Sequence, residues 1–160
     1  MAGIRLALVA MTRRDPAARR STVRLRAEGE AAQEARRLLG EVPELSRFPD
    51  VCFTAQLLTA ELVSNVVRHA GLQPEESFRL DVDCGDDRVA VSVLDGGLGY
   101  DPLAVLGDHA AVRAGHRGVA LVNALADRWG YRRGPGEIEV WFEIDLVPGR
   151  RPWRGREPVP

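Results

Sequence analysis

The sequence contains no lysine: all 22 of its basic side chains, in 160 residues, are arginines. Without a side-chain amine the chain cannot form a Schiff base with a carbonyl substrate. It also cannot place the lysine of a P-loop on a nucleotide phosphate. Any phosphate group that this protein handles must therefore be held by backbone N–H groups, by arginine or by a metal ion.

The sequence also has few cysteines, no long apolar run and almost no net charge. Cys52 and Cys84 are too few for a disulfide framework and match no metal motif, so we expect reduced thiols in a cytoplasmic protein. No apolar stretch approaches the roughly 20 residues of a membrane span, and polar residues follow the short run Leu6–Met11, which argues against a secretion signal. A net charge of −1 predicts neither a nucleic-acid partner nor a membrane partner.

The length fits one domain with two polar ends. We expect a flexible basic arm at residues 1–20, a folded domain at residues 21–147, and a disordered tail rich in arginine and proline at residues 148–160. Apolar residues are spaced as in helices in some segments and alternate in others. The expected strands are Thr22–Ala27, Phe78–Asp83, Arg88–Leu94 and Glu137–Leu146, and the expected helices are Glu30–Val42, Pro49 to about Ala70, and Gly118–Trp129.

This order of elements predicts an α+β fold. Helices and hairpin strands that follow one another in this way favour a two-layer α/β sandwich, in which the helices cover one face of a mainly antiparallel sheet. In the last strand, apolar residues alternate strictly with glutamate, tryptophan and aspartate, which indicates one face against the core.

The long central helix carries an unexpected polar stripe. Glu61, Asn65 and His69 are spaced at i, i+4 and i+8 on a segment that is otherwise apolar around most of its surface. An amide oxygen suits Mg²⁺, and a carboxylate one turn earlier could accept a proton from an attacking hydroxyl. The alternative is that the stripe simply faces solvent.

Two glycine-rich segments could bind a nucleotide. Asp95-Gly96-Gly97-Leu98-Gly99 follows a buried strand, so its carboxylate could accept from a purine amino group while the backbone approaches the ring. Gly115-His116-Arg117-Gly118 precedes the helix that continues from Val119, and free N–H groups at a helix start favour an anion. Each pattern alone is also common in ordinary loops, and His116 alone is more typical of a solvated loop residue.

In their order and spacing, these segments resemble the histidine kinase-like ATPases, also called GHKL or Bergerat-fold proteins. Residues 61–70 are similar to the N-box of that family, residues 95–99 match its D-x-G-x-G box, and residues 115–130 are similar to its second glycine box and the helix after it. The resemblance spans residues 22–147. Within the superfamily the chain looks most like the small stand-alone anti-sigma-factor serine/threonine kinases, which share its L-A-D-x-W-G segment.

The resemblance implies a role for each matched residue. Glu61 would be the general base and Asn65 would bind Mg²⁺, while Asp95 would recognise the adenine amino group of ATP. The remaining nucleotide contacts would come from Gly97, Gly99, Gly115, His116, Arg117, Gly118 and Val119.

The implied activity is that of an ATP- and Mg²⁺-dependent kinase in the cytoplasm. It would phosphorylate a serine or threonine of a STAS-type anti-anti-sigma partner, sequester a sigma factor, and form a homodimer. The alternative is an ATP-responsive interaction switch without catalysis. The chain departs from the family at Glu139, which stands where a threonine near the adenine is common. It also lacks a phosphoacceptor helix, so autophosphorylation on histidine is not expected.

Overall fold

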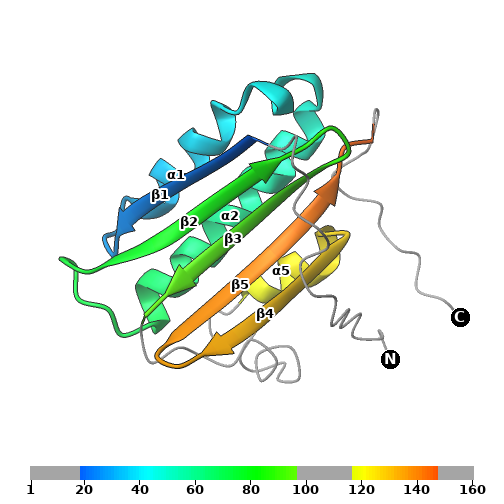
Figure 1. The fold of residues 1–160 in the computed structure, drawn as a ribbon. Coiled ribbons are helices and arrows are strands. Elements are labelled where there is room, and N and C mark those ends of the chain that lie inside the picture. Colours follow the sequence, from blue (N-terminus) through cyan, green and yellow to red (C-terminus); the bar gives the residue numbers. More distant parts are fainter. Residues whose placement is uncertain (1–18, 97–116, 148–160) are drawn as a thin grey trace, which may run out of the picture.

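The fold is a five-stranded antiparallel sheet with helices on one face (Figure 1). The computed structural model describes residues 19–96 and 117–147. The strands are β1 (Arg19–Arg26), β2 (Ser77–Cys84), β3 (Arg88–Asp95), β4 (Arg128–Gly134) and β5 (Glu137–Asp145), and the helices are α1 (Ala31–Gly40), the 3₁₀ helix η1 (Pro43–Arg47), α2 (Pro49–His69) and α5 (Arg117–Leu125). The sheet order is β1-β2-β3-β5-β4, with each neighbouring pair antiparallel. The predicted fold class is confirmed.

The core lies between the sheet and its helices. Alternate residues of β2, β3 and β5 are apolar and point to the helix side, because side chains of a strand alternate between its two faces. Leu58 and Val63 of α2 are fully buried, as are Ala35 and Leu39 of α1, which packs beside α2. The helix α2 is therefore apolar around most of its circumference because it is enclosed by neighbours.

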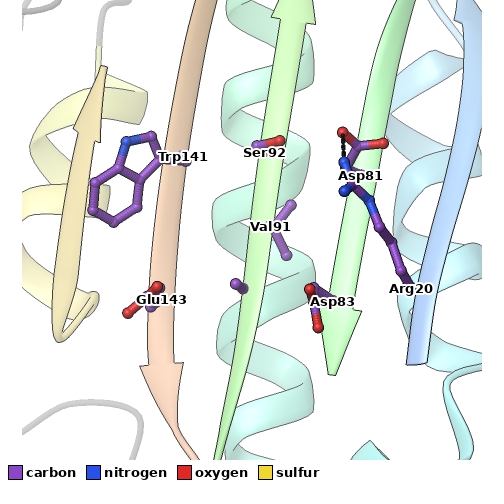
Figure 2. A pocket seen from close by; sticks show the side chains of 8 residues that line it. Arg20, Asp81, Asp83, Val91, Ser92, Trp141 and Glu143 are labelled. Carbon is purple, nitrogen blue, oxygen red and sulfur yellow. Dashed lines mark hydrogen bonds and ion pairs between the residues drawn. The ribbon is translucent and has the colours of Figure 1, made fainter. Parts of the chain in front are cut away.

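The other face of the sheet, here called the outer face, carries charged side chains and one tryptophan, Trp141 (Figure 2). Arg20 of β1 donates to Asp81 of β2 at 2.8 Å, and Thr22 donates to the same carboxylate at 2.6 Å. The indole of Trp141 lies against Gly130, where a Cβ atom would be 2.8 Å from the ring. The missing side chain of Gly130 thus makes room for Trp141.

The predicted end of the last helix is wrong. The helix expected at Gly118–Trp129 ends at Leu125, and Trp129 and Gly130 belong to strand β4. The tertiary contacts of Asp127 explain the difference. Its N–H donates to the carbonyl of Glu143 at 3.0 Å, and its carboxylate accepts from the N–H of Asp145 at 2.7 Å. Both contacts draw the chain into the sheet.

The segment after the first helix also differs from expectation. The helix expected at Glu30–Val42 ends at Gly40, and Pro43 begins η1. Strand β1 begins at Arg19, inside the segment expected to be an arm, and the rest of that arm and the tail lie outside the described residues. Among the described helices, none combines the length and the apolar character that crossing a membrane requires.

Both cysteines are free thiols, as the sequence suggests. Cys52 is half-buried and Cys84 is buried. Burial raises the pKa of Cys52, and it raises the pKa of Cys84 to about 11 together with the negative charges of Glu44 and Asp83. Since the thiolate is the reactive form, both groups are poor nucleophiles at neutral pH.

We expect acid to weaken the pairing of β1 with β2 through Asp81. Burial alone would raise the pKa of this carboxyl, but hydrogen bonds from Thr22 and Arg20 and the charges of Arg20 and Arg79 hold the pKa below its ordinary value. A lowered folded-state pKa adds stability above the unfolded value of about 3.9, and this stability is lost as pH falls through the folded value.

Urea unfolding of the wild type and of Asp81→Asn tests this expectation. The wild type should be the more stable protein at about pH 6, and the difference should shrink at about pH 3. A difference in unfolding free energy that stays constant over that range would show that the Asp81 charge does not hold β1.

Candidate functional site

The polar stripe of α2 lies within the fold rather than on an open surface. Asn65 is 1% exposed, while Glu61 and His69 are half-buried. Pro49 at the first position and Asp50 in the first turn start the helix, and the run of apolar residues keeps it against the sheet. The alternative that these three residues face open solvent is therefore wrong for Asn65.

The first turn of α5 meets α2 at this stripe. A Cβ atom on Gly118 would lie 2.6 Å from Nδ2 of Asn65, 3.1 Å from Cβ of Glu61 and 3.2 Å from the carbonyl oxygen of Glu61. No side chain fits there, so glycine permits the close approach of the two helices. The next residue, Val119, is fully buried and holds the turn in place. The structure thus brings Glu61, Asn65 and Gly118 together.

The far end of α5 is anchored to the sheet by the residues that follow it. Nε1 of Trp129 donates to Oδ1 of Asn123 at 3.1 Å, which connects β4 to the helix. Nε of Arg128 donates to Glu143 at 2.6 Å, and the guanidinium also pairs with Asp145. Hydrogen bonds to these two carboxylates raise the pKa of Arg128, which stays charged throughout the accessible pH range.

These anchoring residues were not identified from the sequence as site residues. The one sequence signal for them is the segment Ala126–Gly130, whose pattern places it at the end of a helix. In the structure this segment anchors the end of α5, and it thereby helps to hold Gly118 beside Asn65.

Asp95 lies on the same side of the sheet as the helices. It is the last residue of β3, it is 3% exposed, and it continues the alternation of Val91 and Val93, which point into the core. Figure 1 shows that β3 ends at the same end of the sheet as the carboxyl end of α2. Asp95 is therefore a buried carboxylate on the same side of the sheet as Asn65, at the end of the sheet where α2 also ends.

Glu139 does not lie on that side. It pairs in register with Leu94 and with Arg132, and its carboxylate forms an ion pair with Arg132 on the outer face. The residue of β5 opposite Asp95 is Ile138, whose side chain belongs to the core. The expected effect of Glu139 on a purine next to Asp95 is therefore not supported, since the two side chains point to opposite faces.

Several predicted residues cannot be placed. Gly97, Gly99, Gly115 and His116 lie outside the described residues, and of Arg117 only the backbone, which begins α5, is described. Within residues 19–96 and 117–147, no three His, Cys, Asp or Glu side chains are grouped as they would be around a metal ion.

Comparison with known families places the chain in one of them. A sequence model of the histidine kinase-like ATPase domain matches residues 25–144, which is most of the chain. The protein therefore belongs to the histidine kinase-like ATPase domain family, and this assigns it an ATP-binding function. No curated protein matches the sequence significantly.

The described residues fit Mg²⁺ and ATP. Asn65 is a buried amide that supplies a hard oxygen, and Mg²⁺ takes few protein ligands and completes its shell with phosphate oxygens and water. The start of α5, whose first N–H groups have no partner within the helix and can bind an anion, lies beside Asn65 because Gly118 has no Cβ. A carboxylate at Asp95 suits the amino group of adenine.

A methyl group at Gly118 should disturb this junction. In Gly118→Ala the new Cβ would displace the amide of Asn65, so we expect weaker ATP binding and a loss of about 1–3 kcal/mol in unfolding free energy from overpacking. Gly29→Ala is the matched control, because nothing lies within 4 Å of the Cβ built there. Isothermal calorimetry and thermal unfolding check both variants, and equal ATP affinity in the two would contradict this account of the junction.

Proposed function

We propose that the protein is a Mg²⁺-ATP-dependent serine/threonine kinase of the anti-sigma-factor type. In this proposal it phosphorylates a STAS-type anti-anti-sigma partner and sequesters a sigma factor in the cytoplasm, and it acts as a homodimer. The observation that supports a kinase is the position of Glu61 one helical turn from Asn65, with Gly118 against both.

Each residue has a separate task in the proposed reaction. Glu61 accepts the proton of the attacking serine or threonine hydroxyl. The hydroxyl oxygen bonds to the γ-phosphorus of ATP as the bond from that phosphorus to ADP breaks, and ADP leaves. The side-chain oxygen of Asn65 would hold Mg²⁺, which neutralises charge on the phosphates when it is bound. Backbone N–H groups at the start of α5 hold phosphate oxygens, and Asp95 positions the adenine.

The close contact at Gly118 supports this division of tasks. Because the start of α5 touches the backbone and Cβ of Glu61, phosphates held there lie beside the carboxylate that must act as base. Glu61 is half-buried and is therefore accessible to a partner hydroxyl, whereas Asn65 is enclosed. A kinase needs both a metal ligand and a base that can reach the acceptor hydroxyl.

Replacing Glu61 should separate binding from chemistry. In Glu61→Gln we expect ATP affinity to stay near that of the wild type and the rate of phosphoryl transfer to fall by about 10²–10⁴, which is the usual contribution of a general base. The measurement is transfer of ³²P from γ-labelled ATP to STAS-type proteins in the presence of Mg²⁺. Glu75→Gln, an exposed carboxylate in the loop before β2, is the control.

Two outcomes would contradict the proposed kinase activity. If the wild type labels no partner, or if Glu61→Gln transfers phosphate as fast as the control, Glu61 is not the base of a kinase. Capture of a partner that depends on ATP and survives in Glu61→Gln, without any labelling, would instead indicate the non-catalytic switch.

A further inference from the structure

Strand β1 is an edge strand whose surface is mostly open. Its one neighbour among the described strands is β2, and six of its eight residues are exposed. An unpaired strand edge presents N–H and C=O groups that can bind another extended chain. The exposed edge alone does not show which kind of chain binds. The groove and the charged side chains next to β1 supply that information.

A groove runs between β1 and the end of α1. Its volume is about 280 Å³, and its apolar wall is formed by Val23, Leu38, Val42, Leu80 and Val82. Glu41 and Glu44, the latter 3.5 Å from Arg19, also line the groove, so the side chains that enter it are expected to be uncharged. Three of these residues, Val23, Leu38 and Val42, are only partly buried within the fold. The groove is larger than the roughly 150 Å³ cavity that holds a benzene ring, so an aliphatic side chain fits.

The outer face of β1 is basic. Arg20, Arg24 and Arg26 alternate along it, because every second residue of a strand points to the same face. Arg20 pairs with Asp81 and Arg26 lies 3.6 Å from Glu28. Arg24 has no ion pair with any residue in the described part of the chain, and it stands directly opposite Arg79 in the ladder. Like charges at opposite positions are unfavourable, so an anionic side chain beside Arg24 would stabilise the strand.

The same arginines disfavour a second copy of the chain on this edge. If two β1 strands pair antiparallel with Thr22 at the centre, Arg20 of one copy stands opposite Arg24 of the other. If Val23 is at the centre, Arg20 of one copy stands opposite Arg26 of the other. Such pairs repel, which is a common protection of edge strands against self-association.

We propose that the edge of β1 binds an extended acidic segment of a partner protein, in which aliphatic residues alternate with aspartate or glutamate. The segment adds a strand beside β1, its aliphatic side chains enter the groove, and its carboxylates meet the arginines of the outer face. In Figure 1 the groove end of β1, near Arg19, lies at the opposite end of the sheet from the end of β3. The proposal does not depend on ATP binding.

Fluorescence anisotropy with three labelled heptapeptides tests the proposal on the full chain without nucleotide. The probe is Val-Glu-Val-Glu-Val-Glu-Val, one comparison peptide has lysine in place of glutamate, and the other has the same composition with its glutamates contiguous. We expect the alternating acidic peptide to bind at least about tenfold more tightly than either of the others.

Two variants locate the binding surface. Arg24→Glu reverses the charge beside Arg79 without removing core contacts, and it should weaken binding of the probe at least about tenfold. Ser21→Trp fills the groove from an exposed position on β1 and should have a similar effect. Arg36→Glu is the control, because Arg36 is exposed on α1 and lies about 200° around the helix from Leu38. Circular dichroism confirms that each variant is folded.

The proposal is overturned if the alternating acidic peptide does not bind at concentrations up to about 1 mM, or if it binds Arg24→Glu as tightly as it binds Arg36→Glu. Light scattering tests whether a second copy of the chain binds this edge instead. A wild-type dimer that Ser21→Trp converts to a monomer would assign the edge to a second copy and contradict the proposal.

Discussion

The site depends on one contact, the approach of Gly118 in α5 to Asn65 and Glu61 in α2. The two helices come so close that a methyl group on Gly118 would overlap the amide of Asn65. A larger residue at this position would separate the free N–H groups of the helix start from the amide and the carboxylate of α2. The rest of the fold serves to maintain this contact, since the sheet supports α2 from one side and the Asp127–Trp129 segment holds the other end of α5.

The absence of lysine is compatible with the groups found on both faces of the sheet. On the helix side, the proposed tasks of the site fall to an amide, two carboxylates and backbone N–H groups, and none of them requires an amine. On the outer face, arginine can bond two carboxylates at once because its guanidinium has several donors in one plane. Arg128 does so with Glu143 and Asp145, and the carboxylate of Asp81 is held in turn by Arg20 and Arg79.

Much of the fold follows from local patterns in the sequence. Strict alternation predicts the faces of Glu137–Asp145, and the short distance along the chain between the expected strands Phe78–Asp83 and Arg88–Leu94 favours their pairing as a hairpin, which β2 and β3 form. Local patterns fail where distant contacts decide the structure. The segment after Leu125 continues a helical pattern, but hydrogen bonds between Asp127 and β5 draw it into strand β4.

The site could be predicted only in part for the same reason. The i, i+4 spacing places Glu61 and Asn65 on one stripe, and the sequence places Asp95 directly after a buried strand. That Asp95 belongs to β3 and lies on the helix side follows only from the structure. The contact of Gly118 with both α2 residues is invisible in the sequence, because it joins positions more than fifty residues apart. Matching positions by motif also misplaced Glu139, whose orientation is set by the register of β5 with β3.

The central claim is that the helix side of the sheet, between Asp95 and the α2–α5 junction, binds ATP. Calorimetric titration of Mg²⁺-ATP into the wild type, Asp95→Asn and Asp83→Asn tests this claim directly. Asp83 is half-buried on the outer face of the same sheet and serves as the control. The account predicts binding by the wild type and by Asp83→Asn, with affinity lower by about tenfold or more in Asp95→Asn, because a hydrogen bond to a charged group is lost. No heat of binding in the wild type, or equal affinity in all three proteins, would contradict it.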